Sequence, residues 1–262
     1  RLNPMADLLP LVDLCKETNC RAFGALPSHV NTDRLGEAST PGIRGAACNY
    51  WAQGIDGMEV WHWFHQWPYQ APFYERLREV PHPDVMAPKD KMYHLLSETE
   101  TFTPEARSNT FQLPAPLHIS EPISVGITIT DDIAHWDSVD RLHGVLLRIR
   151  LSDVTEMAHV VFKLNGMELP ESLLRKINEV YRMTAARYGA RSSYWFIFKL
   201  DREHWPVPGK NILEVTLLET DPDLIAEAPR VRDVELEIKY LLGKNFHRGF
   251  VDPSLGPYEI IS

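Results

Sequence analysis

The sequence has little of what a nucleic-acid-binding or membrane-spanning protein needs. Its 27 lysine and arginine residues are outnumbered by 36 aspartate and glutamate residues, which gives a formal net charge of −9. Because no basic excess is available to neutralise phosphate groups, we expect neither a nucleic acid nor an anionic membrane as a partner. There is also no apolar run of membrane-spanning length and no charged-then-apolar secretion signal at the start. The sequence therefore predicts no membrane span and gives no cellular address.

Cysteine is scarce as well, with only three residues in the chain. Cys15, Cys20 and Cys48 form an odd set without the paired spacing of a zinc site, so we predict no structural metal and no cofactor. The simplest interpretation is that they are small buried residues. A disulfide between Cys15 and Cys20 is the alternative, and the spacing does not decide between the two.

The hydrophobic pattern changes near residue 100. At 262 residues, 44% of them hydrophobic, the chain is long enough for one large domain or two of ordinary size. The first part has helical and strand periods in turn, whereas the second alternates between apolar and polar residues. Residues 97–109, rich in threonine, glutamate and serine, separate the two patterns and are the best linker. We therefore predict two domains, residues 1–96 and 97–262.

Residues 40–67 are the most informative stretch of the first part. Thr40 is a suitable N-cap and Pro41 suits the first helical position. The apolar residues that follow recur at helical spacing; they are Ile43, Ala46, Ala47, Tyr50 and Trp51. Gly54 can supply a left-handed helix end, and residues 58–64 then have the pattern of an aromatic strand. The stretch predicts a helix followed by a strand.

The run RGAACNYWAQGIDGMEVWHWF, residues 44–64, resembles the last helix and eighth strand of glycoside hydrolase-like (β/α)8-barrel proteins. In that family an Ala-rich helix with a Tyr-Trp pair precedes a Gly-x-Asp-Gly turn and an aromatic strand. A helix expected over 10–18 and a strand over 21–26 would then belong to the preceding repeats. Because two strands cannot close a barrel, we expect a fragment whose earlier barrel repeats lie before Arg1. The alternative is that residues 1–80 pack on the downstream domain.

The second part predicts an antiparallel β-sandwich. Short strand-like runs with turn signals between them are typical of that fold. The runs are residues 111–119, 123–130, 144–151, 159–164, 193–200, 211–218 and 233–242. We also expect short helices over residues 84–91 and from Pro170 to Ile177, and a C-terminal tail that docks back.

Three segments of this part carry a second resemblance. VVFKLNGMELP, PGKNILEVTLLE and VRDVELEIKYL are similar to strands of jelly-roll domains of the galactose-binding type, which often follow glycosidase barrels. The resemblance implies a jelly-roll sandwich, which in some proteins binds sugar and in others only supports the barrel. The fold alone does not choose between these roles.

The candidate site is the carboxyl end of the two strands of the first part, where parallel-sheet enzymes place their chemistry. Side chains alternate along a strand, so residues 58–65 divide into two faces. The face expected toward a barrel interior comprises Glu59, Trp61, Trp63 and His65, and the other comprises Met58, Val60, His62 and Phe64. Glu59 would lie deep in the interior, and Trp63 and His65 near the mouth.

The barrel resemblance implies glycoside hydrolysis, which needs two carboxyl groups. The strand ending at Pro27-Ser28-His29 has none where the family's nucleophile would stand, which leaves Glu59 and His65 as the catalytic candidates. The candidates for carbohydrate contact are His29, Trp61, Trp63 and Trp67. The structural alternative to these functional roles is that Glu59 is an ion-paired interior residue and that the aromatic residues pack above it. A metal shared by His62 and His65 is not expected, because a strand points them to opposite faces.

Two functions follow from these patterns. One is part of a glycoside hydrolase-like enzyme acting on a poly- or oligosaccharide, with the aromatic strand end favouring it. The other is a non-catalytic carbohydrate-binding or scaffolding protein, which the missing carboxyl group favours. Either way the expected partners are a carbohydrate and the earlier barrel repeats of the same protein.

Overall fold

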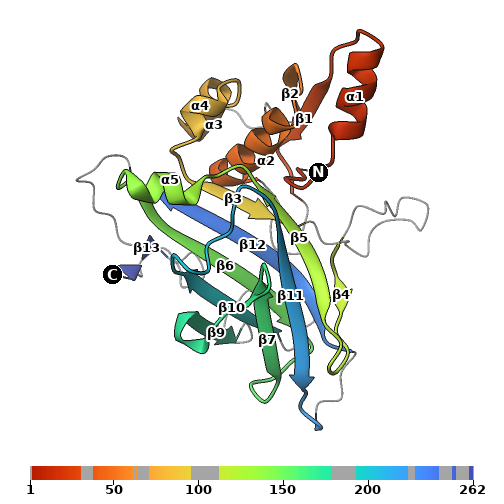
Figure 1. Cartoon of the computed structure of the whole chain (residues 1–262), viewed down its shortest axis with the longest axis vertical. Helices are drawn as coiled ribbons and strands as arrows, with labels where there is room; N and C mark the ends of the chain where they lie inside the picture. Colours follow the sequence, from red (N-terminus) through yellow and green to blue (C-terminus); the bar gives the residue numbers. More distant parts are fainter. Residues whose placement is uncertain are drawn as a thin grey trace.

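The computed structural model describes most of the chain. The described residues are 2–30, 38–61, 63, 71–95, 112–178, 193–223 and 228–241, together with the backbone of 250–251 and 260–261. They form a small unit of helices and parallel strands, red to gold in Figure 1, and a larger set of antiparallel strands, yellow to blue. No helix among these residues is long and apolar enough to cross a membrane.

The first part has the helix, strand, helix and strand that the sequence predicts. They are α1 (Leu9–Glu17), β1 (Phe23–Pro27), α2 (Thr40–Ala52) and β2 (Gly57–Trp61). β1 and β2 pair in parallel, with Pro27 opposite Trp61 at their carboxyl ends. The N-cap of α2 is Ser39 rather than Thr40, and its Oγ accepts a hydrogen bond from the Gly42 backbone N at 3.2 Å. Gly54 has the left-handed φ of 85° that was predicted for it.

β1 and β2 form a two-stranded sheet of their own, and no other strand of the described residues joins it. Helix α2 connects them and lies between this sheet and strand β3 (Figure 1). The described part of the chain therefore contains one parallel βαβ unit, and the barrel to which it was assigned stays a prediction.

A strand that the sequence did not predict links the two parts. Helix α3 (Ala71–Glu79) and the short helix α4 (Pro83–Met86) precede β3 (Lys91–His94). The helix expected over 84–91 is wrong beyond Met86. Lys91 and Tyr93 are both buried and both bond to Asp131, and side chains two residues apart point to the same side in a strand. β3 pairs antiparallel with β12 (Arg230–Tyr240). The large sheet thus includes a strand from before residue 96.

The second part consists of antiparallel sheets, as predicted. In the described residues the larger sheet has the order β3-β12-β6-β10-β9, with β4 also on β12, and the smaller has the order β5-β11-β7-β8. The strands are β4 (Ala115–Pro116), β5 (Ile123–Ile129), β6 (Leu142–Ser152), β7 (His159–Leu164), β8 (Met167–Glu168), β9 (Leu174–Asn178), β10 (Ser193–Leu200) and β11 (Gly209–Glu219). The predicted runs coincide with β5, β6, β7, β10, β11 and β12, whereas residues 111–119 contribute only the short β4. α5 (Ile133–Ser138) connects β5 to β6, and β13 (Phe250–Val251) pairs with β14 (Ile260–Ile261).

The helix expected from Pro170 to Ile177 is wrong. Only a 3-10 turn, η2 (Glu171–Leu173), follows Pro170, and the next residues form the edge strand β9. Apolar residues at 173, 174 and 177 fit a helical stripe, but pairing with β10 places Ile177 opposite Trp195. Tertiary pairing therefore overrides the local pattern, as it often does for strands.

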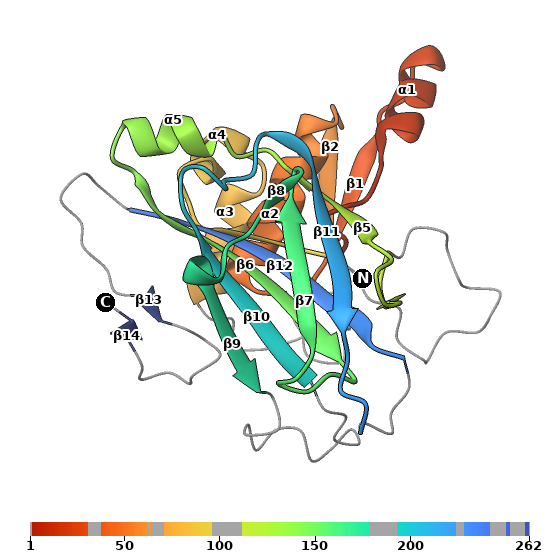
Figure 2. The same ribbon diagram turned by 60° about the horizontal axis from the view of Figure 1, so that its bottom comes forward.

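Side chains from both sheets meet in one continuous core. In Figure 2, β7 and β11 lie in front of β6, β10 and β12, so the two sheets face each other. Phe162 of β7 packs against Phe196 and Phe198 of β10, with ring centroids 5.0 and 5.3 Å apart. This is the sandwich-like arrangement that the alternating strands predict.

Helix α2 has a core of its own and is fixed on the sandwich by close contacts. A Cβ atom at Gly45 would lie 2.7 Å from the Met92 carbonyl oxygen in β3, so only glycine permits this approach. Asn49 Nδ2 donates hydrogen bonds to the carbonyl oxygens of Pro4 and Thr128, both at 2.8 Å. The helix is thereby bonded to the N-terminal segment and to β5 at one side chain.

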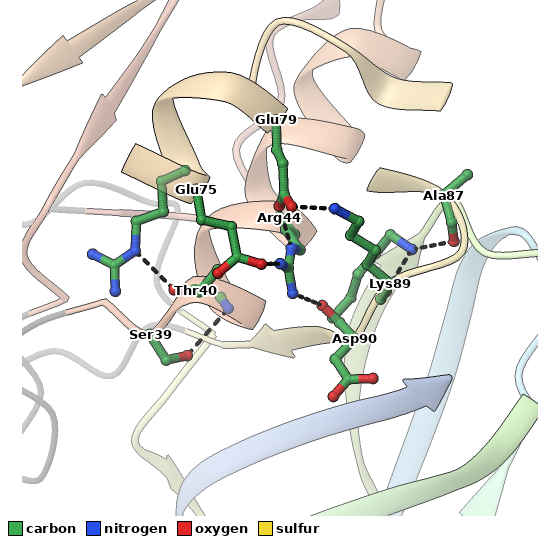
Figure 3. A network of polar contacts seen from close by, with 11 residues as sticks. Ser39, Thr40, Arg44, Glu75, Glu79, Ala87, Lys89 and Asp90 are labelled. Carbon is green, nitrogen blue, oxygen red and sulfur yellow. Dashed lines mark hydrogen bonds and ion pairs between the residues drawn. The ribbon is translucent and has the colours of Figure 1, made fainter. Parts of the chain in front are cut away.

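A polar network holds the helices of the first part together (Figure 3). Arg44 Nε donates to Glu79 Oε2 at 2.7 Å, and its Nη2 donates to Glu75 Oε1 at 2.8 Å. Lys89 also bonds to Glu79, and Arg44 Nη1 reaches the Asp90 carbonyl oxygen at 3.5 Å. Burial alone would raise the pKa of Glu79, but the hydrogen bonds from Arg44 and Lys89 outweigh it and hold the pKa below its ordinary value. Glu79 is therefore ionised, and its bonds connect α3 to α2 and to the segment before β3.

Candidate functional site

The carboxyl ends of β1 and β2 lie side by side, as the parallel pairing requires. The backbone N of Ser28 donates to the Trp61 carbonyl oxygen at 3.0 Å, which continues the pairing one residue beyond β1. The next residue, His29, has its carbonyl oxygen bonded to the Leu2 backbone N at 2.7 Å, and its Nδ1 lies 2.8 Å from Ser28 Oγ. The structure therefore brings the predicted residues His29 and Trp61 to one end of the sheet, with the histidine held from both sides.

Trp63 lies at the same end but points into the protein. Its side chain belongs to the core around α2 and is only 6% exposed. Its Nε1 donates a hydrogen bond to the Leu26 carbonyl oxygen at 2.8 Å. A buried indole whose N–H is bonded to the backbone is typical of a core residue. Trp63 therefore occupies the packed position that was the alternative to its predicted sugar-stacking role.

Glu59 and Trp61 lie on the exposed face of the two-stranded sheet. Trp61 is 57% exposed, and Glu59 is also exposed. The opposite face, with Met58 and Val60, packs against the core around α2, as the alternation predicts. Glu59 was expected deep inside a complete barrel. In the described residues it is exposed on a two-stranded sheet, and its place in a barrel stays a prediction.

The remaining predicted site residues lie outside the described residues. These are His65 and Trp67, together with His62. The site geometry described here is therefore that of His29, Glu59, Trp61 and Trp63. Within the described ranges, no three His, Cys, Asp or Glu side chains are arranged to hold a metal ion.

The cysteines have three different environments, and none is in a disulfide. Cys20 is exposed, Cys15 is partly buried and Cys48 is buried. The expectation of small buried residues is thus confirmed for Cys48 alone. Burial raises the pKa of the Cys48 thiol to about 11, so it is protonated at neutral pH.

Sequence reasoning missed a buried polar cluster between β3, β12 and the end of β5. Lys91 Nζ lies 2.7 Å from Asp131 Oδ1, and both side chains are about 1% exposed. Tyr93 donates its hydroxyl to Asp131 Oδ2 at 2.5 Å, and Tyr240 donates to Oδ1. Burial, followed by the charge of Asp131, raises the pKa of both tyrosines, so they remain hydrogen-bond donors. The only sign of this cluster in the sequence was the alternation of a charged residue, Lys91, with an aromatic residue, Tyr93.

The comparisons with known proteins give no family assignment. No protein-family model matches the sequence, and no curated protein matches it either. The class that the structure itself defines is a parallel βαβ unit packed on an antiparallel, sandwich-like pair of sheets.

Proposed function

We propose that the chain belongs to a glycoside hydrolase-like, carbohydrate-active protein that acts on a poly- or oligosaccharide. In this proposal β1 and β2 are the last two strands of a (β/α)8 barrel, and the sandwich is an appended jelly-roll domain of the galactose-binding type. The carbohydrate contacts the carboxyl ends of β1 and β2, where Trp61 and His29 are neighbours. An exposed indole beside polar groups suits a sugar ring, which has an apolar face and a rim of hydroxyl groups.

The observation that supports the proposal is the exposure of Phe23 and Trp61 on one face of the β1–β2 sheet. Parallel sheets are normally covered on both faces. Here one face packs on α2, while Phe23 and Trp61 on the other are each 57% exposed. We infer that the exposed indole of Trp61 belongs to an interaction surface at the carboxyl end of this sheet. Further parallel strands of the same protein would continue the sheet and turn this face toward a barrel interior.

A non-catalytic role in carbohydrate binding is the second candidate, and two observations favour it. The end of β1 offers Ser28 and His29 but no carboxyl group, and Glu59 lies in solvent rather than in a closed site. Glycoside hydrolysis needs two carboxyl groups that flank the scissile bond. In the catalytic version of the proposal, Glu59 and His65 act only once the interior is closed around them.

Binding of soluble oligosaccharides to the full chain, measured by calorimetry, tests the proposal. Trp61→Ala should weaken binding by about 1–3 kcal/mol, the usual size of a lost aromatic contact. Phe23→Ala is the matched control, because Phe23 has the same exposure on the same sheet but sits at the opposite, amino-terminal end of β1. Equal effects of the two substitutions, or no saturable binding, would contradict a sugar site at the strand ends.

A further inference from the structure

The C-terminal end of α1 brings two cysteines together. The Cys20 backbone N donates to the Cys15 carbonyl oxygen at 2.8 Å, and the Asn19 backbone N donates to the Lys16 carbonyl oxygen at 3.3 Å. Asn19 itself has a left-handed φ of 54°. These two bonds around a left-handed residue define a Schellman motif, and Cys15 and Cys20 occupy the two positions of that motif whose side chains frequently touch.

The backbone geometry of this turn suits a disulfide. The Cα atoms of a disulfide are usually about 4.4–6.8 Å apart. The hydrogen bond joins Cys20 directly to Cys15, and the short covalent links from its two atoms to the Cα atoms limit the Cα separation to at most about 6.7 Å. The Cys20 Sγ lies 3.7 Å from the Thr18 carbonyl oxygen, so the sulfur is turned back toward the end of the helix. Both cysteines are free thiols in the structure.

The two sulfurs differ in accessibility, which gives them different roles. Cys20 is exposed, whereas Cys15 is partly buried and packs against the core around α2. In Figures 1 and 2, α1 lies at the outer side of the βαβ unit, away from the sandwich. A reagent in solution therefore reaches Cys20 first, and Cys15 is placed to react second.

We propose that Cys15 and Cys20 are a redox-active dithiol, whose oxidant is a low-molecular-weight disulfide such as oxidised glutathione. The Cys20 thiolate attacks one sulfur of the oxidant, forms a mixed disulfide and releases one small thiol. The Cys15 thiolate then attacks the Cys20 sulfur, which forms the protein disulfide and releases the second small thiol. Two protein thiols are oxidised, the oxidant is reduced to two thiols, and these take up the two protons that the protein thiols lose.

The protein disulfide is reversible and is independent of the proposed carbohydrate contact. It closes only the short loop of residues 15–20 and leaves one sulfur exposed, and both features favour reduction. Cys20 precedes β1, whereas His29 and Trp61 lie at the opposite, carboxyl end of the two strands. Oxidation therefore ties the end of α1 to the segment that enters β1 and should leave oligosaccharide binding unchanged.

Titration of the full chain with mixtures of reduced and oxidised glutathione tests the pair, with free thiols blocked by N-ethylmaleimide before peptide mass spectrometry. Trypsin cleaves after Lys16 and Arg21, so the disulfide links the peptides of residues 2–16 and 17–21. This linked product should be half-formed within the titration while the buried Cys48 stays reduced. Cys15→Ser should instead accumulate the mixed disulfide on Cys20, and Cys20→Ser should slow the reaction at Cys15 by about tenfold or more.

Two substitutions at the exposed Asn19 test whether the turn holds the pair together. Asn19→Gly keeps the left-handed conformation and should leave the equilibrium unchanged. Asn19→Val opposes that conformation and should lower the equilibrium constant for the protein disulfide by about fivefold or more. Circular dichroism checks that both variants are folded.

Four results would overturn the inference. They are mixed disulfides on both cysteines without the linked product, a disulfide between two chains, a pair that stays reduced in oxidised glutathione alone, and an equilibrium that is the same in Asn19→Gly and Asn19→Val. None of them bears on the strand-end site, which the Trp61→Ala measurement tests separately.

Discussion

Trp61 and Trp63 are two residues apart, yet the structure gives them opposite roles, and truncating each should separate stability from binding. Trp63→Ala removes a buried indole, which costs about 3–5 kcal/mol of the free energy of unfolding. Trp63→Phe keeps most of the packing but leaves the Leu26 carbonyl oxygen without its donor, which costs about 1–3 kcal/mol. Trp61→Ala should change stability by no more than about 0.5 kcal/mol, because the side chain is mostly exposed.

Urea unfolding followed by far-ultraviolet circular dichroism is the suitable assay, since tryptophan fluorescence changes with the substitutions themselves. With a slope of about 3 kcal/mol per molar urea, Trp63→Ala should lower the midpoint by about 1–2 M. Oligosaccharide binding by the folded fraction of Trp63→Ala should be unchanged. The reasoning is refuted if Trp63→Ala is as stable as the parent chain but no longer binds, because Trp63 would then be at the mouth of the site.

Three further predictions concern the first part and its contact with the sandwich. The pKa of Glu79 is lowered in the folded state. The ionised side chain therefore stabilises the fold at pH values above 4.5, the ordinary pKa of a glutamate, and this contribution is lost as the pH falls below 4.5. Glu79→Gln should flatten the acid side of a curve of unfolding free energy against pH. Asp131→Asn should cost about 3–5 kcal/mol in the free energy of unfolding, because it leaves the buried charge of Lys91 uncompensated. Gly45→Ala should lower the melting temperature although alanine favours a helix, since its Cβ would meet the Met92 carbonyl oxygen; an unchanged or raised melting temperature would show that α2 can move away from β3.

Elements with a strong local signal could be predicted from the sequence. The apolar stripe of α2, the turn at Gly54 and the strand-like runs of β7 and β10 each depend on neighbouring residues, and each was found where the pattern placed it. The division of β2 into a packed face with Met58 and an open face with Trp61 likewise follows from a two-residue period.

The elements that were missed depend on partners far along the chain. β3 is a strand because β12, more than a hundred residues later, pairs with it, and β9 is a strand because β10 does. The cluster around Asp131 joins residues from three strands' ends, and no local pattern relates Lys91 to Asp131 or either of them to Tyr240. Long-range pairing therefore decided the fold of the sandwich edges and the position of the buried polar cluster.

Helix α2 joins the two-stranded parallel sheet to the sandwich. Its side chains share one core with β1 and β2, and Cys48 and Trp51 of that core also line a cavity beside β3. The bonds of Asn49, together with the close contact at Gly45, hold the helix on the sandwich. Substitutions at Asn49 or Gly45 should therefore disturb the packing of the βαβ unit on the sandwich.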